Sequence, residues 1–423
     1  TGPQLAVLID DADAVMLIAS AEYQPFIEPH CQDLGKLRQG GLLLHGGAAA
    51  GWRRFEPLLA AASENPPPVC YHMDDEFNII YSSGTTELPK GIVQTHRPRQ
   101  HWSYSNSIEL AFGTDSRALA TTPVYSNGTF LMILPALFTG STLVVMPSFS
   151  PRGFLEVVEK ERISHTFMVP PQFIAVLAES DLESFDLGSL QVILSAGSPL
   201  RRDTKMEVMR RLGPGLFEMY GFSEGFASMI RPHQHANKFG SVGTPVLGFE
   251  GRIVDDDGNE LPRGEIGEIA GYGGGQMRGY HKRGEATEKI ICPDERGRAF
   301  LRSGDIGRMD EDGFLYILDR KKDMIISGGF NVFPADIESV LGEHDDVMDV
   351  TVIGIPDERW GETALALVIP KQGAVTEAET IRAWCNERVA KHQRLARVEF
   401  RDEFPRNALG EVMKRVLREP YWE

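Results

Sequence analysis

The alternation of short β-rich runs with helical stretches is the feature of this sequence that most constrains its fold. Residues 141–146 and 191–194 have the apolar, β-rich character of buried strands, whereas residues 154–161 and 172–179 have the character of helices. Alternation of this kind indicates strands that pair in parallel and are covered by helices. The sequence therefore predicts an α/β fold with layered, mostly parallel sheets.

A change in character near residue 319 indicates a second, smaller domain. The charged run Asp319-Arg320-Lys321-Lys322 follows a short strand predicted at 314–318. Two further strands (347–355 and 364–369) and an amphipathic helix (377–389) are predicted beyond it. The residues after the run, about a hundred, suit one small α+β domain.

We accordingly expect a large N-terminal domain at residues 1–318, a hinge at 319–322 and a small, mobile C-terminal domain at 323–423. The Pro-rich segment 62–72 is expected to be a connector. The chain opens with a predicted helix end and a strand at 14–20, so we expect it to start inside a domain.

The charge balance limits the partners of the chain. Its 423 residues include 43 Lys and Arg against 60 Asp and Glu, which gives a net charge of −17. This argues against a broad surface for nucleic acids or anionic membranes, although a local site for a small polyanion is compatible with it. No apolar run reaches the roughly 20 residues that span a bilayer, and the first residues do not form a signal peptide. The four cysteines are scattered without a CxxC pair, which is typical of reduced thiols in a cytoplasmic protein.

A loop rich in small hydroxyl residues follows the strand predicted at 77–81. It reads Ser82-Ser83-Gly84-Thr85-Thr86 and continues to Lys90 and Gly91. Backbone N–H groups and hydroxyls in such a loop donate to phosphate oxygens, and the lysine adds positive charge. The loop is not a Walker A motif, because Gly91 rather than Ser or Thr follows the lysine. The pattern favours a phosphate-binding loop over a plain surface turn.

This loop resembles the signature of the ANL superfamily of adenylate-forming enzymes, which includes acyl- and aryl-CoA synthetases, peptide-synthetase adenylation domains and luciferases. The residues that match are Ser82, Ser83, Gly84, Thr85, Thr86, Lys90 and Gly91. Glu87 departs from the signature, which has glycine at this position. Glutamate removes backbone freedom and adds a negative charge where the resemblance places a triphosphate. The resemblance implies that Thr86 and Lys90 contact phosphate during catalysis.

Further motifs of the same family follow in family order. Tyr220-Gly221-Phe222-Ser223-Glu224 resembles Y-G-x-[ST]-E. The resemblance implies that Tyr220 stacks on adenine, that Gly221 and Ser223 lie against the nucleotide, and that Glu224 binds Mg²⁺. The loop that contains Gly197 and Ser198 resembles the segment that packs against adenine, although a plain strand–helix turn would suit the same residues.

Motifs near the expected hinge complete the nucleotide and CoA sites that the resemblance implies. Asp305 would bind both ribose hydroxyls, since a carboxylate is a natural acceptor for a diol. Arg320 would contact the ribose or a phosphate, and Lys322 aligns with the hinge residue of the family. The path of the pantetheine arm of CoA would involve Gly328, Gly329 and Trp360. Each of these short motifs would, taken alone, also suit a turn or a charged linker.

The last family signature, P-[RK]-[TN]-x-x-G-K, corresponds to residues 405–411 and departs at its final position. The family lysine there contacts the carboxylate and the α-phosphate during adenylation, whereas this chain has Glu411. We do not favour Lys414 as a substitute, because the family often has a basic residue near that position as well. The resemblance therefore implies a catalytic set of Thr86, Lys90 and Glu224 with an impaired adenylation step.

The acid-binding pocket that the resemblance implies is apolar and aromatic, which favours a fatty or aromatic acid over a charged one. Its candidate residues are Tyr125, Ser126, Gly128, Phe130, Phe173 and Phe222. Ser126 stands where many relatives have histidine. Residues 121–130 lack the aspartate with which peptide-synthetase domains usually bind a substrate amine, so CoA is favoured over a carrier protein as the acceptor.

These motifs together predict an AMP-forming acid–thiol ligase. It would join a small carboxylic acid to ATP with the help of Mg²⁺, and would then transfer the acyl group from acyl-AMP to CoA. A homodimer is compatible with the sequence. Relatives in this family carry about a hundred more residues before the phosphate loop, roughly a small domain.

Two alternatives remain. Glu87 and Glu411 would suit a catalytically impaired relative that binds only a nucleotide or an acyl ligand. Residues 221–225 also match G-x-S-x-G, the nucleophile elbow of serine hydrolases, with Ser223 as the nucleophile. That elbow requires a helix after the serine, whereas residues 227–238 are predicted to form a loop, which counts against a hydrolase.

Overall fold

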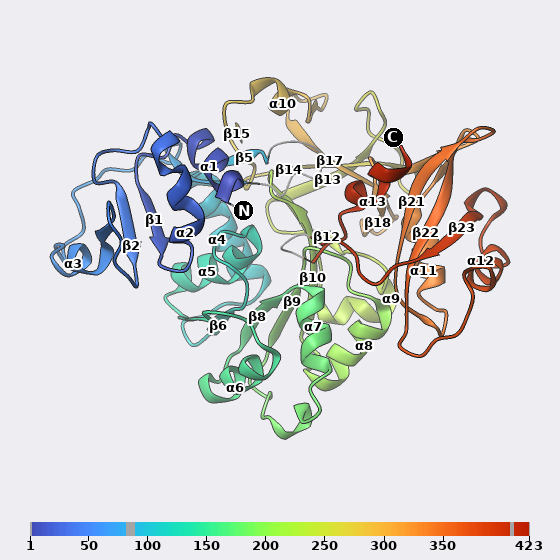
Figure 1. Cartoon of the computed structure of the whole chain (residues 1–423), viewed down its shortest axis with the longest axis horizontal. Helices are drawn as coiled ribbons and strands as arrows, with labels where there is room; N and C mark the ends of the chain where they lie inside the picture. Colours follow the sequence, from blue (N-terminus) through green and yellow to red (C-terminus); the bar gives the residue numbers. More distant parts are fainter. Residues whose placement is uncertain (1, 82–88, 407–409, 423) are drawn as a thin grey trace. The chain divides into compact units, whose positions relative to one another are not determined.

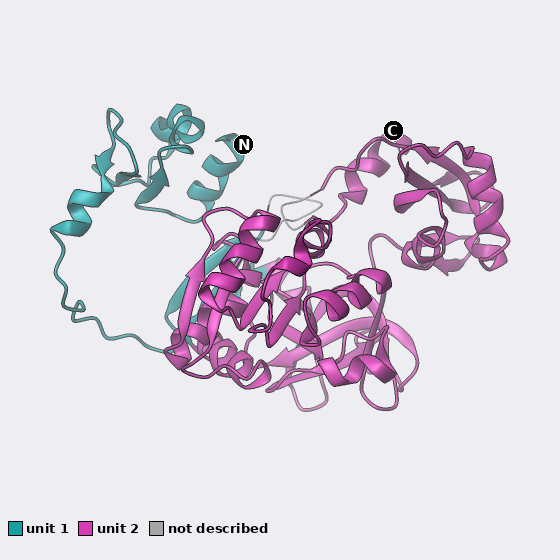
Figure 2. Cartoon of the chain, turned by 90° about the horizontal axis from the view of Figure 1, so that it is seen from below, with its two compact units in different colours: residues 1–96, 278–284 teal, residues 97–277, 285–423 magenta. Residues whose placement is uncertain are grey.

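The computed structural model describes residues 2–81, 89–406 and 410–422, and Figure 1 labels most of its helices and strands. The chain divides into two compact units, which Figure 2 colours separately. The first unit comprises residues 1–96 and 278–284, and the second comprises residues 97–277 and 285–423.

The first unit contains two small sheets. Its elements are α1 (Gly2–Asp11), β1 (Leu17–Ser20), α2 (Gln24–Ile27), β2 (Leu42–His45), β3 (Arg53–Arg54), α3 (Phe55–Ala60), β4 (Glu76–Tyr81), β5 (Gly91–Thr95) and β15 (Gly279–Tyr280). Strands β1, β2 and β3 pair in parallel around a core of Ala19, Ile27, Leu44 and Trp52. Strands β15, β5 and β4 pair antiparallel, with β4 directly before and β5 shortly after the predicted phosphate loop.

The second unit is built on a seven-stranded sheet with the order β12-β11-β10-β9-β8-β6-β7. Its strands are β6 (Arg117–Ala120), β7 (Thr142–Val145), β8 (His165–Met168), β9 (Val192–Ser195), β10 (Leu216–Phe222), β11 (Phe226–Ile230) and β12 (Thr244–Pro245). Strands β6 to β10 pair in parallel, whereas β11 and β12 add an antiparallel edge. The parallel sheet predicted from the sequence is therefore confirmed.

Helices cover both faces of this sheet. They are α4 (His96–Glu109), α5 (Asn127–Thr139), α6 (Pro151–Glu161), α7 (Pro170–Leu177), α8 (Arg202–Arg211) and α9 (His235–Lys238). Leu119 and Met168 pack with α6, α7 and α8, whereas their neighbours Ala118 and Phe167 pack with α5 on the other face. Because successive strand residues point to opposite faces, strands that are covered on both sides consist of continuous apolar runs. This is why β9 was recognisable in the sequence, whereas β7, predicted at 141–146, is a partly exposed edge strand.

A second, antiparallel sheet of five strands shares one of these cores. Its strands are β13 (Phe249–Val254), β14 (Ile266–Gly273), β16 (Ile291–Pro293), β17 (Ala299–Met309) and β18 (Leu315–Arg320), and α10 (Gly284–Glu288) precedes β16. The order is β13-β14-β17-β16, with β18 also paired to β17. Ile253, Ile269 and Met309 pack against Phe226 of the seven-stranded sheet. Parallel pairing is thus a property of parts of the fold, and the expectation of mostly parallel sheets does not extend to this one.

The C-terminal part of the second unit has its own sheet. Its elements are β19 (Ile325–Ser327), β20 (Phe330–Val332), α11 (Pro334–Leu341), β21 (Val347–Asp357), β22 (Gly361–Pro370), α12 (Ala378–Asn386), β23 (Leu395–Phe400) and α13 (Lys414–Arg418). The order is β20-β19-β22-β21, and β23 pairs in parallel with β22. Helices α11 and α12 cover one face of the sheet. The fold is therefore mixed α/β, with a large N-terminal domain and a smaller C-terminal domain, as expected.

Candidate active site

Tyr220 to Glu224 occupy the tip of a tight hairpin between β10 and β11. The two strands pair antiparallel, with Phe222 opposite Phe226. Gly225 lies in the turn with a φ of 128°, and a Cβ there would come within 2.2 Å of the Cα of Gln276. Glycine is therefore required at this turn, because any side chain would meet backbone atoms.

The hairpin contradicts the serine hydrolase alternative. A nucleophile elbow places its serine between a strand and a helix, whereas a second strand begins three residues after Ser223. The loop expected at 227–238 is also wrong, since this segment contains most of β11 and the short helix α9. Strand β11 is buried along its whole length and so lacks the polar–apolar alternation that identifies a half-buried strand.

A buried carboxylate, Asp305, contacts two other residues, and all three were predicted from separate motifs. Its Oδ2 accepts a hydrogen bond from the Tyr220 hydroxyl at 2.7 Å, and its Oδ1 lies 3.0 Å from Nε of Arg320. Asp305 and Arg320 are paired residues of β17 and β18, while Tyr220 comes from β10. The seven-stranded sheet and the sheet of β13 to β18 thus supply one polar cluster.

Burial shifts the pKa values of two groups in this cluster, Asp305 and Tyr220. Burial raises the pKa of Asp305, although the Arg320 guanidinium and the Tyr220 hydroxyl oppose the shift. Burial and the neighbouring carboxylate raise the pKa of Tyr220 well above its ordinary value, so Tyr220 is a neutral donor at physiological pH. Each carboxylate oxygen of Asp305 has two lone pairs, so the group retains the capacity to accept hydroxyl protons from a ligand.

Glu411 lies beside the same arginine. Its Oε1 is 3.7 Å from Nη2 of Arg320, which places the guanidinium between the carboxylates of Glu411 and Asp305. Lys414 is engaged elsewhere, with its Nζ 2.8 Å from Oε1 of Glu338. The position of the last signature therefore brings an anion to Arg320, and the nearby lysine is paired within the small domain.

The predicted adenine loop directly follows β9. Gly197 has a φ of 94°, which favours glycine, and the half-buried Ser198 follows it before α8 begins at Arg202. Gly221, on the hairpin, is equally constrained, since a Cβ there would come within 2.5 Å of the carbonyl oxygen of Phe226.

Lys90 belongs to the first unit and directly precedes β5. Its Nζ lies 5.2 Å from the ring centroid of Tyr280, a cation–π contact. The other predicted residues of the phosphate loop, namely Ser82, Ser83, Gly84, Thr85 and Thr86, lie outside the described residues, as does Glu87.

The predicted acyl-pocket residues near α5 form its start. Ser126 caps the helix, with its Oγ accepting the N–H of Gly128 at 3.2 Å. A Cβ on Gly128 would come within 2.6 Å of the Phe167 ring, so glycine allows the two segments to approach each other. Tyr125, directly before the cap, is 68% exposed. Ser126 therefore acts as the N-cap of α5.

The aromatic candidates for the pocket have different surroundings. Phe130 lies under the buried guanidinium of Arg99, 4.9 Å from the ring centroid. Phe222 packs against Phe226 with ring centroids 5.7 Å apart. Phe173 is fully buried in the core beside α6 and α8, which gives it a packing role in place of the pocket role expected from the sequence.

The candidate residues for the hinge and for CoA lie in three turns. Lys322 follows the end of β18, and burial lowers its pKa. Gly328 and Gly329 form the turn between β19 and β20 with φ values of 57° and 83°. The Gly328 N–H donates to the carbonyl of Trp360 at 2.8 Å, and a Cβ on Gly328 would come within 2.7 Å of the Trp360 ring. The three predicted CoA residues are therefore neighbours.

The metal site implied by Glu224 rests on one carboxylate at the hairpin turn. No group of three or more His, Cys, Asp or Glu side chains able to hold a metal exists among the described residues. Mg²⁺ is commonly held by one or two carboxylates together with substrate phosphates. Glu224 therefore fits a Mg²⁺ ion whose remaining ligands come from a nucleotide and water.

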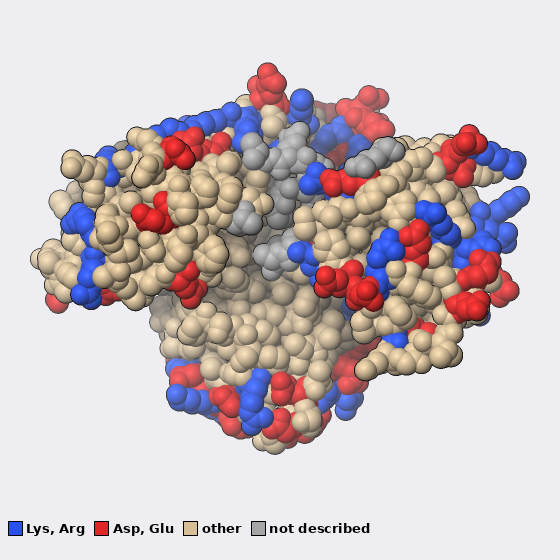
Figure 3. All heavy atoms as spheres, viewed as in Figure 1, with Lys and Arg blue, Asp and Glu red and all other residues tan. Residues whose placement is uncertain are grey.

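On the face in Figure 3, basic and acidic side chains are interspersed and no broad basic area is visible. In the part of the chain that the structure describes, no helix is long and apolar enough to cross a bilayer.

The chain belongs to the family of AMP-binding enzymes. The family model described as AMP-binding enzyme matches residues 1–281, and that of the AMP-binding enzyme C-terminal domain matches residues 336–411. The resemblance to the ANL superfamily is thereby confirmed.

Individual relatives are acid–CoA ligases. Feruloyl-CoA synthase of an Amycolatopsis species is 34% identical over 421 residues, which cover 98% of this chain and 81% of that protein. Indoleacetate–CoA ligase of Aromatoleum aromaticum is 32% identical over 428 residues, which cover 99% and 81% of the two proteins. Among solved structures, ATP-bound MatB from Rhodopseudomonas palustris superimposes with a TM-score of 0.88 at 28% identity, covering 100% of this chain and 82% of that chain.

Proposed function

We propose that this chain is an AMP-forming acid–CoA ligase. The observation that carries the proposal is the meeting of Tyr220, Asp305 and Arg320 in a chain of the AMP-binding enzyme family. In the first step a carboxylic acid and ATP give acyl-AMP and pyrophosphate. In the second step the CoA thiol attacks the acyl carbonyl, AMP leaves, and the thioester forms.

The cluster around Asp305 is suited to a ribose. Asp305 accepts both ribose hydroxyls through its free lone pairs, while Tyr220 and Arg320 hold the carboxylate in place. Gly197 and Ser198 approach the adenine, on which Tyr220 stacks. Arg320 supplies a positive charge beside the ribose and the α-phosphate.

The first step brings two anions together, so the protein must contribute charge neutralisation and positioning. Lys90 and the donors from Ser82 to Thr86 serve the phosphates. Mg²⁺, when bound by Glu224 and the nucleotide, supplies further neutralisation. In the second step the small domain rotates about Lys322, and Gly328, Gly329 and Trp360 form the path of the pantetheine arm.

An aromatic or fatty acid is the proposed substrate. Phe130, Phe222 and Tyr125 provide an apolar and aromatic surface next to the start of α5 and the hairpin. The names of the relatives agree with this class, since feruloyl-CoA synthase and indoleacetate–CoA ligase act on aromatic acids.

A second candidate function is that of a catalytically impaired relative that binds a nucleotide or acyl ligand without completing the ligation. The contact between Glu411 and Arg320 favours it, because an anion stands where the family has a lysine. The ligase proposal accommodates this contact as a slow first step, whereas the alternative requires that no acyl-CoA forms.

Calorimetric titration with AMP tests the ribose assignment. Asp305→Asn should weaken AMP binding about 10- to 100-fold, because a hydrogen bond to a charged group contributes roughly 1.5 to 3 kcal/mol. Asp312→Asn is the matched control, since this aspartate pairs with Lys238 at 2.7 Å, has a side chain that is 70% exposed and lies outside the cluster. An unchanged affinity of the Asp305 variant would remove this residue from the site.

A further inference from the structure

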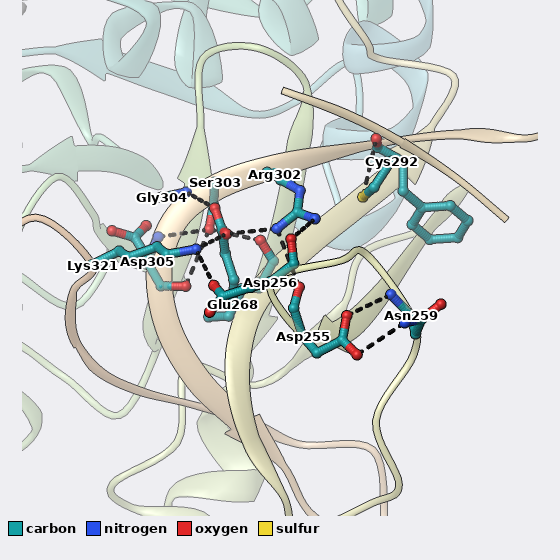
Figure 4. A network of polar contacts seen from close by, with 12 residues as sticks. Asp255, Asp256, Asn259, Glu268, Cys292, Arg302, Ser303, Gly304, Asp305 and Lys321 are labelled. Carbon is teal, nitrogen blue, oxygen red and sulfur yellow. Dashed lines mark hydrogen bonds and ion pairs between the residues drawn. The ribbon is translucent and has the colours of Figure 1, made fainter. Parts of the chain in front are cut away.

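Glu268 on β14 is a buried acid that lies at the centre of a polar network (Figure 4). Its side chain is 7% exposed. Its Oε2 accepts hydrogen bonds from Nη1 of Arg302 and from Nζ of Lys321, each at 3.0 Å. Its Oε1 accepts the backbone N–H of Gly304, also at 3.0 Å. Glu268 is a lone acid within a strand and belongs to none of the motifs described above.

The donors to Glu268 come from two segments with different proposed roles. Gly304 directly precedes the ribose candidate Asp305. Its φ of 75° lies in the left-handed region, which favours glycine at this turn. Lys321 directly precedes the hinge candidate Lys322. The backbone N–H of Lys321 also donates to the carbonyl of Gly304 at 2.8 Å, so Lys321 and Gly304 are joined both directly and through Glu268.

Lys321 also contacts a second carboxylate, that of Asp256, which is far more exposed than that of Glu268. Asp256 lies 2.8 Å from Nζ of Lys321, but its side chain is 92% exposed. Solvent screens an exposed pair of this kind, whereas breaking a buried pair leaves a charge that water does not reach. Glu268 is therefore the carboxylate that matters energetically for the position of Lys321.

We infer that Glu268 is a positioning residue that couples the hinge to the ribose-binding carboxylate. It holds the turn of Gly304, and with it Asp305, while Lys321 is docked. The inference rests on the proposed function, which assigns the ribose to Asp305 and the hinge to Lys322.

The coupling has a direct physical cause. When the backbone turns at the hinge next to Lys321 and withdraws its side chain, Glu268 is left buried with one cation fewer. The remaining donors to Glu268, among them the N–H of Gly304, must then readjust around the unpaired charge. Asp305 follows Gly304 in the chain and is paired with Arg320, so the readjustment reaches both groups of the ribose cluster. Coupling of this kind is reciprocal, and bound AMP should therefore favour the docked hinge.

Three variants separate this role from simple support of the fold. Glu268→Gln keeps a side-chain oxygen for the N–H of Gly304 but removes the charge that holds Lys321. Lys321→Gln removes the same ion pair by replacing its more exposed partner. Asp256→Asn is the matched control, because it removes the other carboxylate partner of Lys321 at an exposed position. AMP affinity by calorimetry, the rates of the two half-reactions and the melting temperature are measured for each.

Glu268→Gln and Lys321→Gln should each weaken AMP binding about 3- to 30-fold, the range for residues that act on a site without touching its ligand. In the double variant AMP binding should weaken by less than the product of the two single effects, because both substitutions remove the same interaction between Glu268 and Lys321. The ratio of the rate of adenylation to that of thioester formation should change in both variants and stay constant in Asp256→Asn.

Unchanged AMP affinity in a folded Glu268→Gln variant would overturn the coupling. Where that variant does not fold, an unchanged affinity and half-reaction ratio in Lys321→Gln would overturn it equally. Failure of the unmodified chain to bind AMP at millimolar concentration would refute the proposed function and the coupling with it. If the unmodified chain binds AMP and both variants bind it with the same affinity, the coupling alone is refuted.

Discussion

Replacing Glu411 by lysine should accelerate adenylation about 100- to 1000-fold. A single preorganised charge-stabilising group commonly contributes this much to a rate. In this chain the position carries the opposite charge, next to the arginine of the ribose cluster. The change therefore replaces an anion by a cation at the position where the proposed mechanism joins the carboxylate to the α-phosphate.

The distances indicate that an effect of this size is reasonable. Two unit charges about 4 Å apart interact by roughly 4 kcal/mol at an effective dielectric constant near 20. Glu411 lies 3.7 Å from Arg320, whose side chain is 52% exposed, so solvent reduces the realised interaction to about 1 kcal/mol for this pair. A closed site that holds ATP excludes much of that water, and a barrier lowered by about 3 to 4 kcal/mol corresponds to the expected acceleration.

The assay is acid-dependent exchange of labelled pyrophosphate into ATP. Glu403→Lys is the control, since it makes the same charge change at an exposed residue of the same C-terminal segment. Formation of acyl-CoA from supplied acyl-AMP should change little in either variant, because the proposed mechanism assigns residue 411 to the first step alone. Glu87→Gly should raise exchange further, and its effect should couple with that of Glu411→Lys because the proposed mechanism assigns both positions to one triphosphate.

Two results together would refute this reasoning. One is turnover of the unmodified chain at ordinary rates of about 1 to 1000 per second, and the other is no response to Glu411→Lys. The alignment of the last signature would then be wrong, and Lys414 would be the next residue to test despite its pairing with Glu338.

The remaining predictions concern the hinge and the excluded hydrolase. Burial raises the pKa of Asp319 to about 6 from an ordinary value of 3.8, so the folded state binds more protons than the unfolded state between these values. The contribution of Asp319 to stability therefore falls as pH rises from about 4 to 6, by up to roughly 3 kcal/mol, and is flat above. Asp319→Asn should gain stability relative to the unmodified chain across this window in denaturant unfolding, and a pH-independent difference would contradict the assignment. Ser223→Ala should not reduce hydrolysis of p-nitrophenyl esters, since the serine lies in a hairpin, and loss of such activity in the variant would restore the hydrolase alternative.

Much of the fold could be predicted because its central strands are covered on both faces. The run at 191–194 contains β9 except for its last residue, and the helix predicted at 154–161 lies within α6. Periodicity did not reveal β11, since a fully buried strand of five residues has no alternation, and Pro232 soon afterwards suggested a loop. The antiparallel pairing of β13 to β18 depends on long-range contacts that a local pattern does not encode.

The candidate site was predictable where residues occur in contiguous motifs. Tyr220, Asp305 and Arg320 were each identified this way, and the structure brings them together. Glu268 was missed because its role depends on Arg302, Gly304 and Lys321, which are distant in sequence from it. Aromatic character alone did not separate Phe173, a core residue, from surface aromatics near α5.

The most direct test of the ligase assignment is the nucleotide product of the complete reaction. The chain at high concentration would be incubated with ATP, Mg²⁺, CoA and a panel of aromatic and fatty acids, including ferulic and indoleacetic acid, and the products separated by chromatography. We expect AMP and an acyl-CoA in equal amounts, formed slowly by the unmodified chain and faster by Glu411→Lys. Formation of ADP with the thioester, or no thioester from any acid with either protein, would contradict an AMP-forming acid–CoA ligase.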